Sequence, residues 1–95
     1  MDPNICIAEL ERIVEMGSAY VGPHDDPLAQ AYGVASVLRD LASTEDQREK
    51  ISTAIAEIVG WYKTNQSADL EGATRERRKA VAAIAGLREA YTPAA

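Results

Sequence analysis

The sequence predicts an all-α protein, a three- or four-helix bundle with a C-terminal antiparallel helical hairpin. Apolar residues recur every three or four positions in four segments, which is the helical period. Alanine, the best helix former, accounts for 17 of the 95 residues, and no segment alternates as a strand would. We expect one domain, 1–95, with helices at about 3–16, 27–42, 45–64 and 68–91, a loop at 18–26 and a frayed tail at 92–95.

The first helix is predicted to begin at Asp2 and Pro3. Aspartate is a preferred N-cap, and proline is tolerated in the first turn because its missing N–H has no partner there. Gly17 is a candidate for the residue that ends this helix. The expected inner stripe is Cys6, Leu10 and Ile13, widened by Ile7 and Val14.

The second helix repeats this opening with Asp26 and Pro27, after a loop rich in glycine and proline. Gly33 disfavours the first turns by about 1 kcal/mol relative to alanine. Its expected inner stripe is Leu28, Tyr32, Ala35, Leu38 and Leu41.

Ser43 or Thr44 is expected to cap the third helix, and Thr44 with Gln47 has the spacing of a capping box. Asn65 and Gln66 predict a break after it. The inner stripe is the most regular in the chain and places Trp61 in the core: Ile51, Ala54, Ile55, Ile58, Trp61 and Tyr62.

Ser67 or Asp69 opens the fourth helix, whose two halves differ. The short connection to the third helix predicts an antiparallel hairpin. The second half carries an apolar face of Ala80, Ile84, Leu87 and Tyr91, whereas the first half, EGATRERRK, is mostly charged. A seam of Leu70, Ala73, Ala80, Ile84 and Leu87 passes through Arg77.

Composition indicates a thin core and a need for a partner. Valine, isoleucine and leucine together number 19 and phenylalanine is absent, so little large aliphatic surface is available for burial. The net charge of −5 disfavours nucleic acid and anionic membranes. The single Cys6, the absence of a signal-peptide pattern and the lack of a long apolar run lead us to expect a cytoplasmic protein without a membrane span.

Catalytic and metal-ligating patterns are weak. His24 is the only histidine, and Asp25 and Asp26 follow it. An enzyme using His24 with either aspartate is therefore an alternative, although the ordinary interpretation is that Asp26 caps a helix while the other two are solvated. We expect no cofactor, no metal ion and no catalytic residues, because no ligand motif or phosphate-binding glycine loop is present.

The run at 75–79 is the most distinctive stretch, with four basic residues in five positions. It is either a solvated helix turn or a contact for an acidic partner or nucleic acid. Arg77 is expected to lay its stem along apolar surface or to pair with an acid across a helix interface. Small residues further along the helix offer a strip where another helix can approach. The candidate partner contacts are Arg75, Arg77, Arg78, Lys79, Ala82 and Gly86.

The opening Met-Asp-Pro-Asn and the stretch EIVGWYKTN, around Trp61, resemble small uncharacterised helical proteins of actinobacteria and their phages. The resemblance implies a phage-derived or accessory helical protein and transfers no site residue. The thin core, Arg77 on the seam and the absence of a catalytic constellation favour a non-enzymatic interaction or regulatory module that binds another protein, itself as a homodimer, or both. Nucleic-acid or acidic-ligand binding through 75–79 is the alternative.

Overall fold

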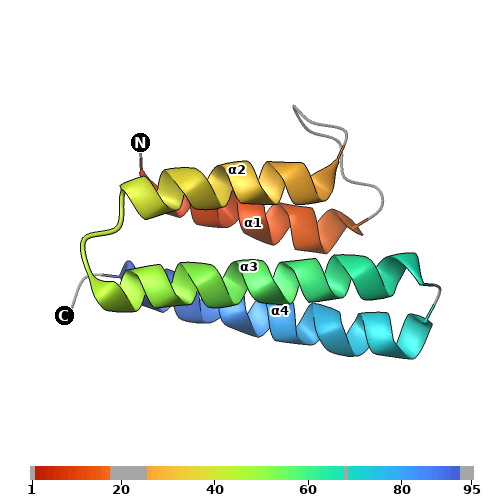
Figure 1. Cartoon of the computed structure of the whole chain (residues 1–95). Coiled ribbons are helices and arrows are strands. Elements are labelled where there is room, and N and C mark those ends of the chain that lie inside the picture. The colour runs from red at the N-terminus through yellow and green to blue at the C-terminus, as the bar shows by residue number, and fades with distance from the viewer. Residues whose placement is uncertain (1, 18–25, 68, 93–95) are drawn as a thin grey trace.

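Four helices form a bundle in the computed structural model, which describes residues 2–17, 26–67 and 69–92. Each helix packs against two others, so that α1 contacts α2 and α4, and α3 contacts α2 and α4. The prediction of an all-α helical bundle is confirmed for these residues (Figure 1). The helices are α1 (Pro3–Met16), α2 (Pro27–Asp40), α3 (Glu45–Gln66) and α4 (Leu70–Ala90).

The helix starts follow from side-chain capping. Asp2 and Asp26 each accept a hydrogen bond from the backbone N–H two residues later, at 2.9 Å. Asp69 accepts from Gly72 N–H at 2.9 Å, and Thr44 accepts from Gln47 N–H at 3.1 Å. These bonds satisfy N–H groups that the first turn of a helix leaves unpaired.

The helix ends differ from the expected ranges at four places, one of which is the end of the fourth helix, at Ala90 instead of Tyr91. The second helix stops at Asp40, and the fourth starts at Leu70 because Asp69 is its cap. The predicted break at 65–66 is wrong, since α3 continues to Gln66. The Ser67 hydroxyl donates to the Thr64 carbonyl at 2.7 Å and so satisfies one of the carbonyls that a helix end leaves free.

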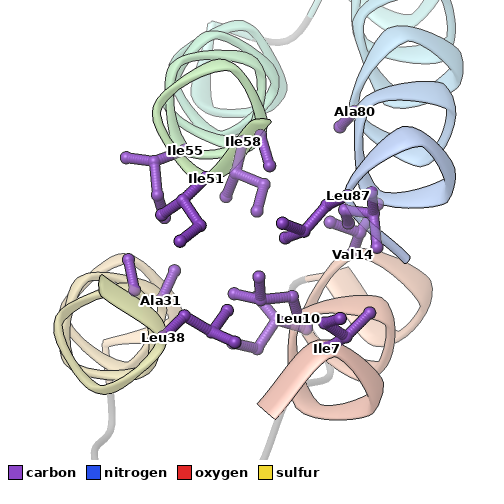
Figure 2. Packing of buried hydrophobic residues seen from close by; sticks show 14 of the residues in the cluster. Ile7, Leu10, Val14, Ala31, Leu38, Ile51, Ile55, Ile58, Ala80 and Leu87 are labelled. Atoms are coloured by element: carbon purple, nitrogen blue, oxygen red, sulfur yellow. The ribbon is translucent and has the colours of Figure 1, made fainter. Parts of the chain in front are cut away.

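The core lies between all four helices (Figure 2). Trp61 is buried, with 3% of its surface exposed, as its stripe predicted. On α2, however, Ala31 is buried and Tyr32 is 49% exposed, so the expected place of Tyr32 in the stripe is wrong. The inner face of α2 is centred on Ala31, Ala35 and Leu38, and Tyr32 lies about 100° round the helix from Ala31.

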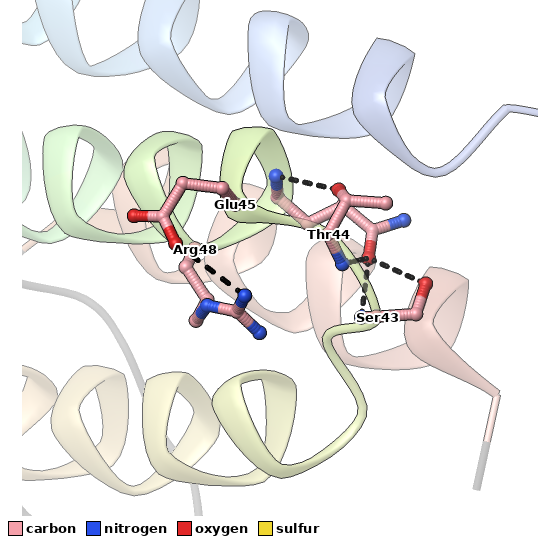
Figure 3. Close-up of polar contacts among 5 residues, drawn as sticks. Ser43, Thr44, Glu45 and Arg48 are labelled. Carbon is pink, nitrogen blue, oxygen red and sulfur yellow. Dashed lines mark hydrogen bonds and ion pairs between the residues drawn. The ribbon is translucent and has the colours of Figure 1, made fainter.

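Gln47 links the beginning of α3 to the end of α4. Its Oε1 accepts from the backbone N–H groups of Ser43 and Thr44, at 2.7 and 3.3 Å, which completes the predicted capping box (Figure 3). Its Nε2 donates to the carbonyl of Ala90 at 3.1 Å. One amide therefore satisfies donors at one helix start and an acceptor at another helix end.

Tyr91 makes the corresponding link to α2. Its hydroxyl donates to the carbonyl of Leu38 at 3.2 Å, within the last turn of α2. Burial raises the pKa of Tyr91, with a smaller contribution from Cys6. The neutral phenol is the form that this position favours.

We expect Gln47→Ala to lower the free energy of unfolding by about 1–2 kcal/mol, because both the capping-box acceptor and the donor to Ala90 are lost. Gln47→Glu should cost less, since a carboxylate retains the acceptor role at the positive end of α3. Chemical denaturation of the two variants measures the difference. Equal losses would show that the Ala90 contact alone matters.

Tyr91→Phe should cost about 1 kcal/mol at neutral pH, because the Leu38 carbonyl loses its donor. The raised pKa in the folded state means that the unfolded chain releases the phenolic proton first. Wild-type stability should therefore fall as pH rises above about 10, and the variant should fall less steeply. Denaturation at pH 7 and at alkaline pH tests this, and parallel curves would contradict it.

Candidate functional site

The N-terminal turns of α4 extend past the end of α1. The Arg77 side chain of α4 reaches Val14, near the end of α1, and the later Arg88 contacts the earlier Glu11, so the two helices run in opposite directions. Helix α1 has 14 residues and α4 has 21, a difference that corresponds to about 10 Å of helix. Figure 1 shows α3 and α4 projecting beyond α1 and α2 at the end where residues 67–69 join them.

This projection leaves Leu70 uncovered. Its side chain is 81% exposed, the largest value among the exposed large hydrophobic residues of the described chain. The expected seam is therefore wrong at Leu70, whereas its members Ala73 and Ala80 are buried. Sequence reasoning placed Leu70 on the apolar seam of the fourth helix and did not consider it as a contact residue. The available signal was the difference in predicted helix length between the first and the fourth helix.

The basic run separates into three environments. The Arg77 Nε donates to the Val14 carbonyl at 3.3 Å, and Lys79 pairs with Glu76 at 3.3 Å on its own helix. Arg75 and Arg78 are exposed and make no ion pair or side-chain hydrogen bond with the residues that the structure describes. Arg75 and Arg78 are therefore the two guanidinium groups of the run that have no partner among the described residues.

Arg77 takes a role that the sequence did not predict. Its hydrogen-bond partner is neither an acid nor merely apolar surface, but the Val14 carbonyl, one of the last four of α1. Such carbonyls lack an intrahelical donor, and a cation is favoured at the negative end of a helix. The same seam carries an ion pair between Glu11 and Arg88. Arg77 thus belongs to the structure of the bundle.

A shallow depression of about 540 Å³ lies on the projecting part of α4. It brings together one large apolar side chain and two unpaired cations, all on the surface. Its lining residues are Leu70, Glu71, Thr74, Arg75 and Arg78. A ligand that combines an apolar group with carboxylates matches this surface, because guanidinium groups bind carboxylates in a bidentate fashion.

Ala82 and Gly86 continue along α4. Ala82 is exposed and Gly86 is half-buried, and a Cβ added at Gly86 would meet no atom within 4 Å. The structure therefore brings Arg75, Arg78, Ala82 and Gly86 to the outer side of α4, away from the core. It places Arg77 on the side that faces α1.

The catalytic alternative has little described structure to test. His24 and Asp25 lie outside the described residues, and Asp26 accepts from Leu28 N–H as the cap of α2. Burial raises the pKa of Tyr62, and the Asp26 carboxylate raises it further. Burial also raises the pKa of the Cys6 thiol. Within residues 2–17, 26–67 and 69–92, no three His, Cys, Asp or Glu side chains are grouped to hold a metal ion.

No family model matches this chain, and comparison with curated proteins and with solved structures gives no significant match. None of the described helices is both long and apolar enough to cross a lipid bilayer. The site is therefore interpreted from its own geometry.

Arg77→Met should lower the free energy of unfolding by about 1 kcal/mol, because the stem is retained while the Val14 carbonyl loses its donor and α1 its cation. Arg75→Met, on an exposed part of the same helix, should stay within about 0.5 kcal/mol. Denaturation in dilute solution compares them. Equal effects of the two substitutions would contradict the assignment of Arg77 to the α1 end.

Proposed function

We propose that this protein is a non-enzymatic interaction module that binds another protein through the projecting part of α4. The partner surface that fits is an acidic amphipathic segment, with an apolar side chain against Leu70 and carboxylates at Arg75 and Arg78. The observation that carries the proposal is the 81% exposure of Leu70 beside two cations without an ion pair in the described chain.

Burial of Leu70 supplies the favourable apolar term. Covering a leucine side chain contributes roughly 1.5–3 kcal/mol, whereas exposed ion pairs contribute little each. The two arginines therefore act mainly in selecting the partner and its orientation. Because the whole chain carries a net charge of −5, a partner with acidic residues is attracted only at this local basic surface.

The predicted C-terminal hairpin provides the rigid support in this proposal. Gln47 at the beginning of α3 contacts Ala90 at the end of α4, and at the other end Thr64 lies close to Gly72. These contacts support an antiparallel α3–α4 pair that holds the depression in position without α1. Binding sites on packed helices are held more precisely than sites on loops.

Protein binding is favoured over nucleic-acid binding by the state of the basic run. Two of its four cations, Arg77 and Lys79, already have partners within the protein. Two remaining guanidinium groups beside a leucine are a small electrostatic footprint for a polyanion. The same surface suits a carboxylate-bearing peptide.

The test is quantitative affinity capture from lysate of the source cells with wild type and the double variant Leu70→Gln/Arg78→Gln. We expect the double variant to capture at least tenfold less of a protein that wild type enriches. A tenfold loss of affinity corresponds to about 1.4 kcal/mol. The matched control Ile5→Gln/Lys50→Gln also replaces one exposed aliphatic residue and one unpaired cation, on α1 and α3. It should capture as wild type does.

A captured protein that all three forms enrich equally would contradict the proposal. Loss of the captured material after nuclease treatment would instead support the nucleic-acid alternative. Binding that weakens as salt is raised, in wild type more than in the double variant, would confirm the contribution of Arg78.

A further inference from the structure

The side of α4 that points away from the bundle has no partner within the described structure. We define this outer face by Arg75, Arg78, Ala82, Gly86 and Glu89. Its members are exposed, apart from the half-buried Gly86, and the space outside Gly86 is open to at least 4 Å. The face is therefore an unpartnered surface of a helix that is otherwise packed against α1 and α3.

Two of the three charged residues on the outer face, Arg75 and Glu89, lie at equal distances from Ala82 along the helix. Arg75 precedes Ala82 by seven residues and Glu89 follows it by seven. Seven residues are two turns with a drift of about 20°, so all three lie on one line along α4. Neither charged side chain makes an ion pair or side-chain hydrogen bond among the described residues.

Arg75 and Glu89 cannot satisfy one another within a single chain. They are 14 positions apart in one continuous helix, which corresponds to about 21 Å. A second copy of the same helix, turned end for end about Ala82, brings each arginine opposite a glutamate. Parallel pairing would instead set arginine against arginine and glutamate against glutamate, which is unfavourable.

We propose that the outer face of α4 binds a second copy of this chain in an antiparallel, two-fold symmetric contact centred on Ala82. Such an isologous contact repeats every interaction twice. Arg75 of each copy pairs with Glu89 of the other, giving two ion pairs. Arg78 of each copy lies opposite Gly86 of the other, where the absence of a side chain leaves room for the arginine stem.

The residue at the symmetry axis allows close approach. Ala82 has a single methyl group, so the two helix axes can reach the lower part of the usual 8–10 Å range. Between Arg75 and Glu89 the outer face carries the small residues Ala82 and Gly86, and Arg78 is its one other large side chain. The ion pairs set direction and register, because a shift by one turn separates both pairs at once.

This contact is separate from the proposed function and does not rest on it. Leu70 lies 12 positions before Ala82 and is therefore about a third of a turn away round the helix. Glu89 is about 28 Å along α4 from Leu70 and has no part in the depression. Variants at Glu89 thus test self-association, and variants at Leu70 test partner binding.

The experiment is sedimentation equilibrium of the purified full chain from about 10 µM to 1 mM, the range of weak to moderate self-association. Wild type should show a monomer–dimer equilibrium. The single variants Arg75→Glu and Glu89→Arg each turn two attractive pairs into two repulsive ones, and each should weaken the dimer about tenfold or more. Lys50→Glu changes the net charge as Arg75→Glu does but lies on α3, and should leave the dimer constant within about twofold.

Two combinations of these substitutions test the register of the dimer contact. The double variant Arg75→Glu/Glu89→Arg restores opposite charges across the axis and should dimerise about as wild type does. A mixture of the two single variants should form a heterodimer, because one chain then carries carboxylates at both positions and the other guanidinium groups at both. Neither result can arise within one chain, since the two positions are about 21 Å apart.

A wild-type chain that stays monomeric up to about 1 mM would overturn the proposal, as 1 mM is the weak end of specific association. So would weakening by Lys50→Glu equal to that by Arg75→Glu, because the effect would then come from net charge alone. Failure of both the double variant and the mixture to restore association would likewise overturn it. Circular dichroism of each variant confirms that the helices are retained before association is compared.

Discussion

The packing of the 14-residue helix α1 against the 21-residue helix α4 is the constraint on which the exposed surface of α4 depends, and the Arg77 guanidinium contacts the Val14 carbonyl near the end of α1. A helix of 14 residues cannot cover one of 21, so the level at which they meet decides which turns of α4 remain uncovered. Near the end of α1, Arg77 satisfies a carbonyl and places a cation at the negative pole of that helix. The exposure of Leu70 is consistent with this difference in length, whereas Arg75 and Arg78 are exposed because they lie on the outer side of α4.

The same requirement recurs at two other helix ends. Tyr91 donates to the Leu38 carbonyl of α2, and Gln47 donates to the Ala90 carbonyl of α4. A core with many alanines buries little apolar area per residue, so polar contacts that join helix ends contribute a larger share of the specificity of packing. These long-range hydrogen bonds link every helix of the described bundle to another one.

Helix α4 therefore has three sides with different contacts. One side packs on α3 and one on α1, and both are occupied within the chain. The third side points outward and carries charges that have no ion-pair partner among the described residues. The depression at its beginning suits an acidic amphipathic segment, and the line from Arg75 to Glu89 suits another copy of itself. The two proposed contacts share Arg75 and Arg78 but depend on different residues otherwise.

Local rules were sufficient for the helices and their starts. Asp2, Asp26, Thr44 and Asp69 cap as their residue types predict, because an N-cap needs only backbone groups within three positions. The period of three and four residues likewise placed Trp61 in the core, since helical spacing alone determines which residues share a face. The candidate contacts Arg75, Arg78 and Ala82 were also found exposed on one side of α4.

Tertiary structure alone decided the exposure of Leu70 and Tyr32 and the hydrogen-bond partner of Arg77. A periodic stripe shows which residues share a helix face but not whether a neighbouring helix reaches far enough to cover them, so Leu70 was placed on the apolar seam and is exposed. On α2, Ala31 and Tyr32 belong to overlapping stripes, and packing against α1 and α3 selects the smaller residue. Arg77 is separated by 63 positions from the carbonyl that it binds, a distance over which no local pattern in the sequence carries information.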